Sequence, residues 1–283
     1  NRLGRSFCIF NKFRKKLRLE LSDKGVICMS SHKYARQLQK ELQETHGVFY
    51  KIVKGTRDLG ISYTAGVARP CCLFKSRASK NSNRTCKVKQ LALISRNARK
   101  LYKGSALPAA IWGHQACGIA ESDMLQIERQ AAHCTGITPV GRCRTLALIT
   151  SYGEYGHPKA RIIRETIQTF FQIVVEMVSL GKFGDIQECW GKAKKTINNN
   201  WEKVRGPFSV VIIMLQQLGW EPVAFNCWRD HNGESWVWDN NATSPKTLIN
   251  AIIDRSNALA ILKACDHYGG VGMEEGIDLH HTL

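Results

Sequence analysis

The chain has 283 residues, enough for one large domain or two smaller ones, and its 43% hydrophobic and 23% charged residues are ordinary for a globular protein. This composition excludes a disordered, collagen-like or coiled-coil protein. Lys and Arg number 41 against 23 Asp and Glu, and the resulting formal net charge of +18 indicates a polyanionic partner.

In chain order, apolar spacing and turn residues predict a small α+β unit over residues 1–66. In the first helix, Phe10, Phe13, Leu17 and Leu21 recur at helical spacing. The expected elements are an amphipathic helix over 7–21, a buried strand at 26–29, a helix that ends near Gly47, a strand at 48–53, a turn at 55–58 and a strand from Leu59 to Thr64.

After Pro70 the pattern becomes helical. On a continuous helix through residues 89–103, one face is apolar and is expected to join the core, with Leu91, Ile94, Ala98 and Leu101. The opposite face is a basic stripe with Lys89, Arg96, Arg99, Lys100 and Lys103. Such a stripe is either a solvated helix surface or a contact for nucleic acid.

The distribution of charge favours nucleic acid. Residues 1–107 carry 25 Lys and Arg against 5 Asp and Glu, whereas residues 108–283 carry 16 against 18. Between Leu59 and Ala120 there are 11 Lys and Arg and no acidic residue. A solvated helix normally mixes charges of both signs. The lack of acid therefore indicates a surface that meets phosphate.

The remaining chain is expected to be mostly helical, with a boundary at Arg205-Gly206-Pro207 and a hairpin turn at Asp230-His231-Asn232-Gly233 among four Trp. The further helices are expected at 105–117, 121–134, 158–180, 184–203, 208–218 and 245–265.

Motifs for other chemistries are missing from the sequence. The eleven Cys form no CxxC pair, which favours reduced thiols in an intracellular protein, in nucleus or cytoplasm, over zinc or secreted disulfides. There is no P-loop, GxGxxG or nucleophile elbow. No apolar run reaches the roughly 18 residues of a membrane span. We expect no metal, no cofactor and no membrane partner for this chain.

Three segments together resemble the non-LTR (LINE-type) retrotransposon reverse transcriptases, over roughly residues 7–135. The segment 17–24 (LRLELSDK) is similar to the family's motif D, and 57–61 (RDLGI) resembles the Y-L-G-V element after the palm. The segment 107–113 (LPAAIWG) resembles a stretch of the thumb, with Trp112 in place of Tyr. The order and separation of the segments carry the resemblance.

The resemblance implies a role for each segment. Lys24 would be the motif D lysine, which assists the leaving pyrophosphate, and Leu59 and Gly60 would help to hold the primer end. The thumb would grip the template–primer backbone through its basic residues, namely Lys75, Arg77, Lys80, Arg84, Lys87, Lys89, Arg96, Arg99, Lys100 and Lys103. The family's catalytic aspartates precede motif D. They and Mg²⁺ are therefore expected only in the full-length parent, and this chain, which begins at Asn1, is expected to be an inactive fragment.

We therefore expect a mainly helical α+β protein. Residues 1–66 would be a palm remnant, residues 67–205 a helical thumb-like region, and residues 206–283 a small Trp-rich α+β module of unknown role. The expected function is to grip RNA and DNA template–primer as the C-terminal part of an RNA-directed DNA polymerase, with the rest of the polymerase upstream as partner. Two alternatives stay open: a stand-alone basic helical protein that binds RNA or scaffolds a ribonucleoprotein, and a membrane-surface binder.

Overall fold

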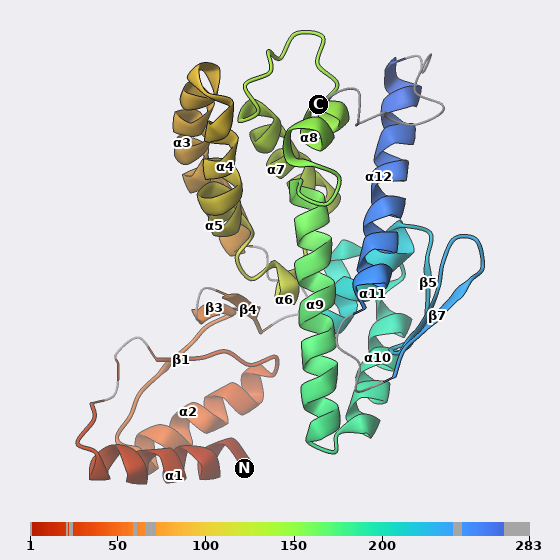
Figure 1. Ribbon diagram of the computed structural model, residues 1–283. Helices are drawn as coiled ribbons and strands as arrows, with labels where there is room; N and C mark the ends of the chain where they lie inside the picture. The colour runs from red at the N-terminus through yellow and green to blue at the C-terminus, as the bar shows by residue number, and fades with distance from the viewer. Residues whose placement is uncertain are drawn as a thin grey trace. The chain divides into compact units, whose positions relative to one another are not determined.

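A computed structural model describes residues 2–20, 22, 25–58, 61–65, 69, 72–239 and 245–268. The chain divides into two compact units, an N-terminal unit (Asn1–Pro70) and a C-terminal unit (Cys71–Leu283). Helices dominate and the sheets are small (Figure 1). The expectation of a mainly helical α+β protein is confirmed at this level.

The N-terminal unit contains two helices and short strands in its described part. Its elements are α1 (Arg2–Lys16), β1 (Val26–Ile27), α2 (His32–His46), β2 (Lys51–Ile52), β3 (Gly55–Asp58) and β4 (Ile61–Thr64). Strand β1 precedes α2 in the chain and β2 follows it, and the two strands pair in parallel. Strands β3 and β4 pair as an antiparallel ribbon. The prediction of a turn at 55–58 is wrong, because these residues form strand β3 and pair with β4.

Helix α2 has clear signals at both ends. The Ser31 hydroxyl accepts from the Tyr34 N–H at 3.4 Å at its start. Gly47 ends it at φ +67°, a left-handed conformation that glycine adopts without a Cβ clash. Leu38 and Leu42 are buried on its inner side and pack with Ile27 of β1. The helix and its end agree with the sequence prediction.

The apolar side of α1 is not buried as the sequence predicts. Phe10, Phe13 and Leu17 are 52%, 60% and 64% exposed. The helix packs instead through Phe7, which contacts His46 and Tyr50, and through buried Asn11. A helix-spaced apolar stripe shows which face is apolar but not what covers it.

The C-terminal unit is a helical body with one three-stranded antiparallel sheet, β5-β6-β7, among the described residues. Its elements are α3 (Cys72–Ile94), η1 (Arg96–Ala98), α4 (Arg99–Leu101), η2 (Tyr102–Ala106), α5 (Leu107–Ile111), α6 (His114–Cys117), α7 (Glu121–His133), α8 (Arg144–Tyr152), α9 (Pro158–Ser179), α10 (Phe183–Ile197), η3 (Trp201–Lys203), α11 (Pro207–Gln217), β5 (Glu221–Ala224), β6 (Cys227–Arg229), β7 (Ser235–Val237) and α12 (Lys246–Tyr268).

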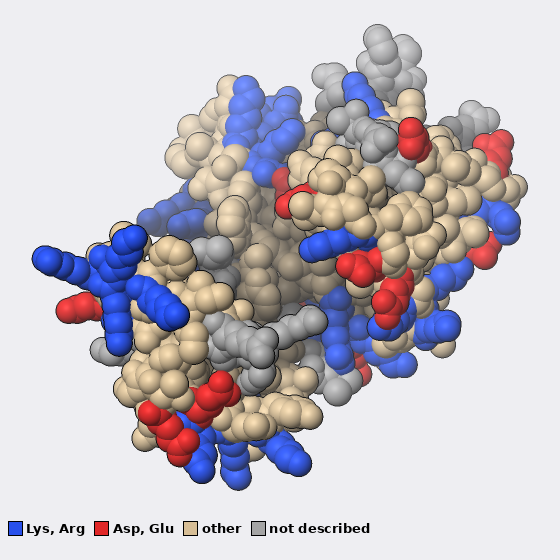
Figure 2. Space-filling model, turned by 90° about the horizontal axis from the view of Figure 1, so that it is seen from below, with Lys and Arg blue, Asp and Glu red and all other residues tan. Residues whose placement is uncertain are grey.

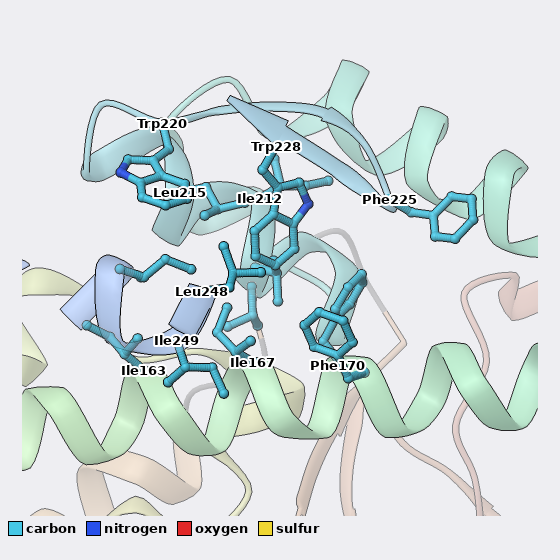
Figure 3. Packing of buried hydrophobic residues seen from close by; sticks show 14 of the residues in the cluster. Ile163, Ile167, Phe170, Ile212, Leu215, Trp220, Phe225, Trp228, Leu248 and Ile249 are labelled. Atoms are coloured by element: carbon cyan, nitrogen blue, oxygen red, sulfur yellow. The ribbon is translucent and has the colours of Figure 1, made fainter. Parts of the chain in front are cut away.

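Helix α9 is central to the larger core of this unit, alongside α10, α11 and α12 (Figure 1). Its buried side chains Ile163, Ile167 and Phe170 point toward Trp228 of β6 and Leu248 of α12 (Figure 3). Trp228 is fully buried, with its ring centroid 5.7 Å from that of Phe170. The helix expected at 158–180 is thus present, and its apolar side lines the core.

The expected boundary at 205/206 does not coincide with the observed division, which lies between residues 70 and 71. The helix that follows Gly206 is α11, and its Val210–Leu215 segment lies in the same core as Phe170 of α9 and Trp190 of α10. Gly206 has φ +84° and precedes Pro207 at the start of α11. The Gly-Pro pair therefore marks a helix start rather than a gap between cores.

A second core lies in the C-terminal unit among α3, η2, α5, α7, α8 and the start of α9. Tyr102 is fully buried there, and its hydroxyl donates to the Ile127 carbonyl at 3.1 Å. Burial raises the pKa of this phenol well above its usual value, so it stays protonated as a donor. This core supports the helix surface on which the basic residues lie.

Candidate nucleic-acid interface

Helix α3 lies on α7 through a narrow and partly polar inner face. Its buried positions are spaced by three and four residues, as one side of a helix requires, and are Ala78, Asn81, Thr85, Val88 and Ala92. The Asn81 amide donates to Gln130 of α7 at 3.5 Å, and the Gln130 amide donates to the Ala78 carbonyl at 3.4 Å. These contacts fix which side of α3 faces outward.

The outward sides of α3 carry five of the ten predicted basic residues. Lys80, Arg84 and Lys87 follow one another at i, i+4 and i+7, so they form one stripe along the helix. Lys75 and Lys89 are also exposed but project from the other flank. The helix therefore presents basic side chains on two flanks of one acid-free surface.

The helix is interrupted within the segment 89–103, for which the sequence predicts one continuous helix. Helix α3 ends at Ile94, and Ser95 is extended with φ −141° and ψ 123°. As a result Leu91 and Ile94 are 47% and 86% exposed instead of buried. The predicted apolar core face is wrong here, with Ala98 alone buried of its four members.

Beyond the break, η1, α4 and η2 form a second helical stretch with its own orientation. Ala98, Tyr102 and Ala106 are buried at intervals of four. Arg96, Lys100 and Lys103 lie on exposed positions of the same stretch. Lys89 and these three side chains thus lie on two separate helical stretches, not on one stripe of a single helix.

The wide turn at η2 is a π-helix, and Pro108 explains one of its features. In a π turn the carbonyl of Lys103 would accept from residue 108, and proline has no N–H to give. The guanidinium of Arg161 on α9 donates to this carbonyl instead, at 2.7 Å. Arg161 also pairs with Glu165 at 2.6 Å. Arg161 is not among the residues predicted from the sequence. The available signal was Pro108, whose missing N–H leaves the Lys103 carbonyl in need of another donor.

The exposed cations of this region have no acidic partner in the part of the chain that the structure describes. We call them the basic surface: Lys75, Lys80, Arg84, Lys87, Lys89, Arg96, Lys100 and Lys103. Among the described residues, no carboxylate forms an ion pair with any of them. Figure 2 shows that Lys and Arg also outnumber Asp and Glu on the face that it draws.

The positive field also acts on a neighbouring histidine. Partial burial lowers the pKa of His133 at the end of α7, and the cations Arg142 and Lys89 lower it further. Lys89, one of these two cations, belongs to the same acid-free stretch, so its positive charge reaches the end of α7.

Two of the predicted contact residues, Arg77 and Arg99, interact with other groups of the protein instead. The Arg77 guanidinium donates to the Trp112 carbonyl, which ties α3 to the end of α5. Arg99 is half-buried, and its charge acts on the Tyr152 phenol. Lys24, Leu59 and Gly60, the residues assigned to motif D and the primer-holding strand, lie outside the described residues. The basic residues are therefore the part of the predicted site that the structure describes.

The described residues also bear on metal binding and on membrane insertion. They contain no group of three or more His, Cys, Asp or Glu side chains that could hold a metal ion. They also contain no helix both long and apolar enough to cross a membrane. Comparison of the chain with protein-family models, curated proteins and solved structures gives no match.

Proposed function

We propose that this chain is the backbone-gripping C-terminal part of an RNA-directed DNA polymerase. The observation that carries the proposal is the basic surface of α3–η2, whose eight exposed cations have no ion-pair partner among the described residues. Phosphate would supply the missing negative charge. Contacts of this kind fix a duplex in place without reading its sequence.

The arrangement of the cations suits a rigid support for a duplex. They stand on helices that are anchored to α7 through Asn81 and Gln130 and to α9 through Arg161. Because these helices are anchored, they lose less conformational entropy on binding than a flexible basic tail would. The segments that resemble reverse transcriptases support the same proposal, since the resemblance implies that these helices belong to a thumb.

The exposed side of α1 supports the idea of a larger parent. Phe10, Phe13 and Leu17 are each more than half exposed. Apolar side chains grouped in this way commonly mark a surface that another protein part covers. The upstream polymerase is the partner that we propose for them.

Salt-dependent binding to an RNA–DNA hybrid tests the proposal. With roughly five phosphate contacts, log K should fall with log salt concentration at a slope of about −4 to −5 on a duplex. Reversal of one stripe, Lys80→Glu with Arg84→Glu and Lys87→Glu, should make the slope shallower by about 2 to 3. It should weaken binding to every sequence alike.

A second triple variant controls for total charge. Lys182, Lys195 and Lys203 are exposed on the same unit, away from α3. Changing all three to Glu alters the net charge equally and should leave most of the affinity. Equal losses in the two triple variants would contradict the proposal, as would a shallow slope for the unmodified chain.

Substrate preference separates the polymerase reading from a stand-alone RNA-binding protein. A duplex grip should bind hybrid primer–template better than single strands and should ignore sequence. Preference for one folded RNA over the hybrid would favour the RNA-binding alternative. The chain alone should not extend a primer with Mg²⁺ or Mn²⁺, because the metal-binding aspartates are proposed to lie upstream, and extension would contradict this.

A further inference from the structure

The C-terminal unit contains a cavity of about 750 Å³ among α6, α7, α8, α9, α11 and α12. This volume is within the range of small-molecule sites. One part of its wall is apolar, with Leu125, Leu148, Ile162, Met214 and Leu259. The basic surface of α3–η2 contributes no residue to it.

The other part of the cavity wall is charged and has an excess of cations. Glu128 and Arg144 lie 3.5 Å apart, and Glu121 and Lys263 form an ion pair at 3.0 Å. Lys159 and Arg129 line the same cavity. No carboxylate among the described residues pairs with either of them.

Lys159 is the most constrained of these cations. It stands in the first turn of α9, packed round by protein yet still reached by solvent from the cavity. Burial lowers the pKa of its ammonium, and the charge of Glu128 only partly opposes this. Its Nζ makes no hydrogen bond to the described residues. A desolvated ammonium without an acceptor is unfavourable until an anion joins it.

The start of α8 adds to the positive character of this end. Its first turn, with Cys143, Arg144 and Thr145, lines the cavity, carries no acidic residue, and has no side-chain cap from Cys143. An uncapped helix start favours negative charge near its N–H groups. The first turn of α7 also lines the cavity but already carries Glu121 and Asp123.

We propose that this cavity binds a small amphipathic anion, a molecule with one carboxylate or phosphate group and an apolar body. The anionic group pairs with Lys159, with Arg129 and the start of α8 nearby. The apolar body lies against Leu148, Ile162 and Leu259. This site is independent of the nucleic-acid grip, since the two share no residue.

Calorimetric titration of the full chain with matched ten-carbon probes tests the site. Decanoate and decyl phosphate carry the two candidate head groups, decanol removes the charge, and decyltrimethylammonium reverses it. At least one anion should bind saturably at one site, about tenfold or more tighter than decanol. The tighter of the two anions identifies the head group. Absence of saturable anion binding, or equal affinity for anion and alcohol, would overturn the proposal.

Substitutions locate the probe within the cavity. Lys159→Met should weaken anion binding about tenfold and leave decanol binding unchanged, whereas Lys159→Arg should keep most of it. Lys195→Met, on the exposed side of α10, is the matched control. Ala260→Phe should fill the space and abolish binding of every probe. Unchanged anion affinity in Lys159→Met would overturn the assignment, and the unmodified chain's probe series tests the site even where a variant fails to fold.

The same variants keep the two proposals apart. Lys159→Met should leave the salt slope for hybrid binding unchanged, and reversal of the Lys80, Arg84 and Lys87 stripe should leave anion titration unchanged. Loss of one activity therefore does not decide the other.

Discussion

His157 is held in its neutral form at the start of α9. Its Nε2 lies 2.8 Å from the Asn257 Oδ1, so Nε2–H donates there, and Nδ1 accepts from the Ala160 N–H at 3.5 Å. Burial lowers the pKa of this imidazole to about 4, and the hydrogen bond with Asn257 opposes the shift only partly. Protonation of Nδ1 would remove the acceptor that caps α9.

His157 should therefore make the protein acid-sensitive. Its folded pKa of about 4 lies below the value near 6.5 of an unfolded chain, so the unfolded state binds the proton first as pH falls. The stability that neutral His157 contributes should be fully present above pH 7. By pH 4.5 this group should have lowered the free energy of unfolding by roughly 2–3 kcal/mol.

Urea unfolding at pH 7.5, 6 and 4.5 measures this effect as a difference between the natural chain and His157→Gln. The variant should lose less stability on acidification, because glutamine does not titrate. Parallel losses in the two proteins would assign the acid sensitivity to other groups.

Arg161 should be important for stability, because it satisfies the Lys103 carbonyl and pairs with Glu165. Arg161→Ala should lower the free energy of unfolding by about 1 kcal/mol, since the solvent-exposed Lys103 carbonyl loses its donor and Glu165 loses its ion-pair partner. Arg161→Lys should recover only part of this, because a single ammonium does not reproduce the planar fork. Arg164→Ala on the same helix is the control, and equal losses in thermal melts would refute the role.

At the scale of single elements, the sequence predicts well wherever one local rule decides the outcome. Helix α9 matches the helix expected at 158–180, and α2 ends at Gly47 as expected. The hairpin after β6 turns at Asp230–Gly233 as its residues indicate. In each case spacing or turn chemistry within a few residues is sufficient.

The prediction of helix ends and buried faces fails where contacts with residues distant in the sequence determine them. Ser95 breaks the helix between Ile94 and Arg96, and no glycine or proline announces it. Apolar residues before the break stay exposed, while Asn81 and Thr85 are buried: Asn81 donates to Gln130 of α7, and the Thr85 carbonyl accepts from the Cys134 thiol just after α7. The basic character of the candidate interface was predictable from composition, but the face that each cation occupies was not.

Asp230 allows a direct test of turn chemistry in the β6–β7 hairpin. Its Oδ1 accepts from the N–H groups of Asn232 and Glu234, each at 2.9 Å. Although burial raises the pKa of this carboxyl, these hydrogen bonds and that from Trp236 lower it overall. Asp230→Ala should cost about 1–2 kcal/mol in urea unfolding and Asp230→Asn less, because the amide keeps one acceptor. A larger loss for Asn would contradict the account.

At the scale of the whole molecule, the two units differ in how much core supports them. The N-terminal unit's main cluster is small, with Ile27, Ala35, Leu38 and Leu42 as its buried members. The C-terminal unit has two larger clusters, and one of them joins residues on both sides of Gly206. Larger buried apolar clusters give greater resistance to local opening.

Limited proteolysis of the full chain should therefore cut first in the N-terminal unit or near its end and leave a resistant fragment that begins near residue 71. A fragment of residues 206–283 should not accumulate, because removal of α9 and α10 would expose Trp228, Leu215 and Leu248 to water. Mass spectrometry of timed digests with trypsin, whose Lys and Arg sites occur throughout the chain, identifies the fragments in order. Cleavage near Asn198–Gly206 with survival of the C-terminal piece would show that α11, α12 and the sheet form a unit of their own. The larger resistant fragment would show that the core built around α9 is indivisible.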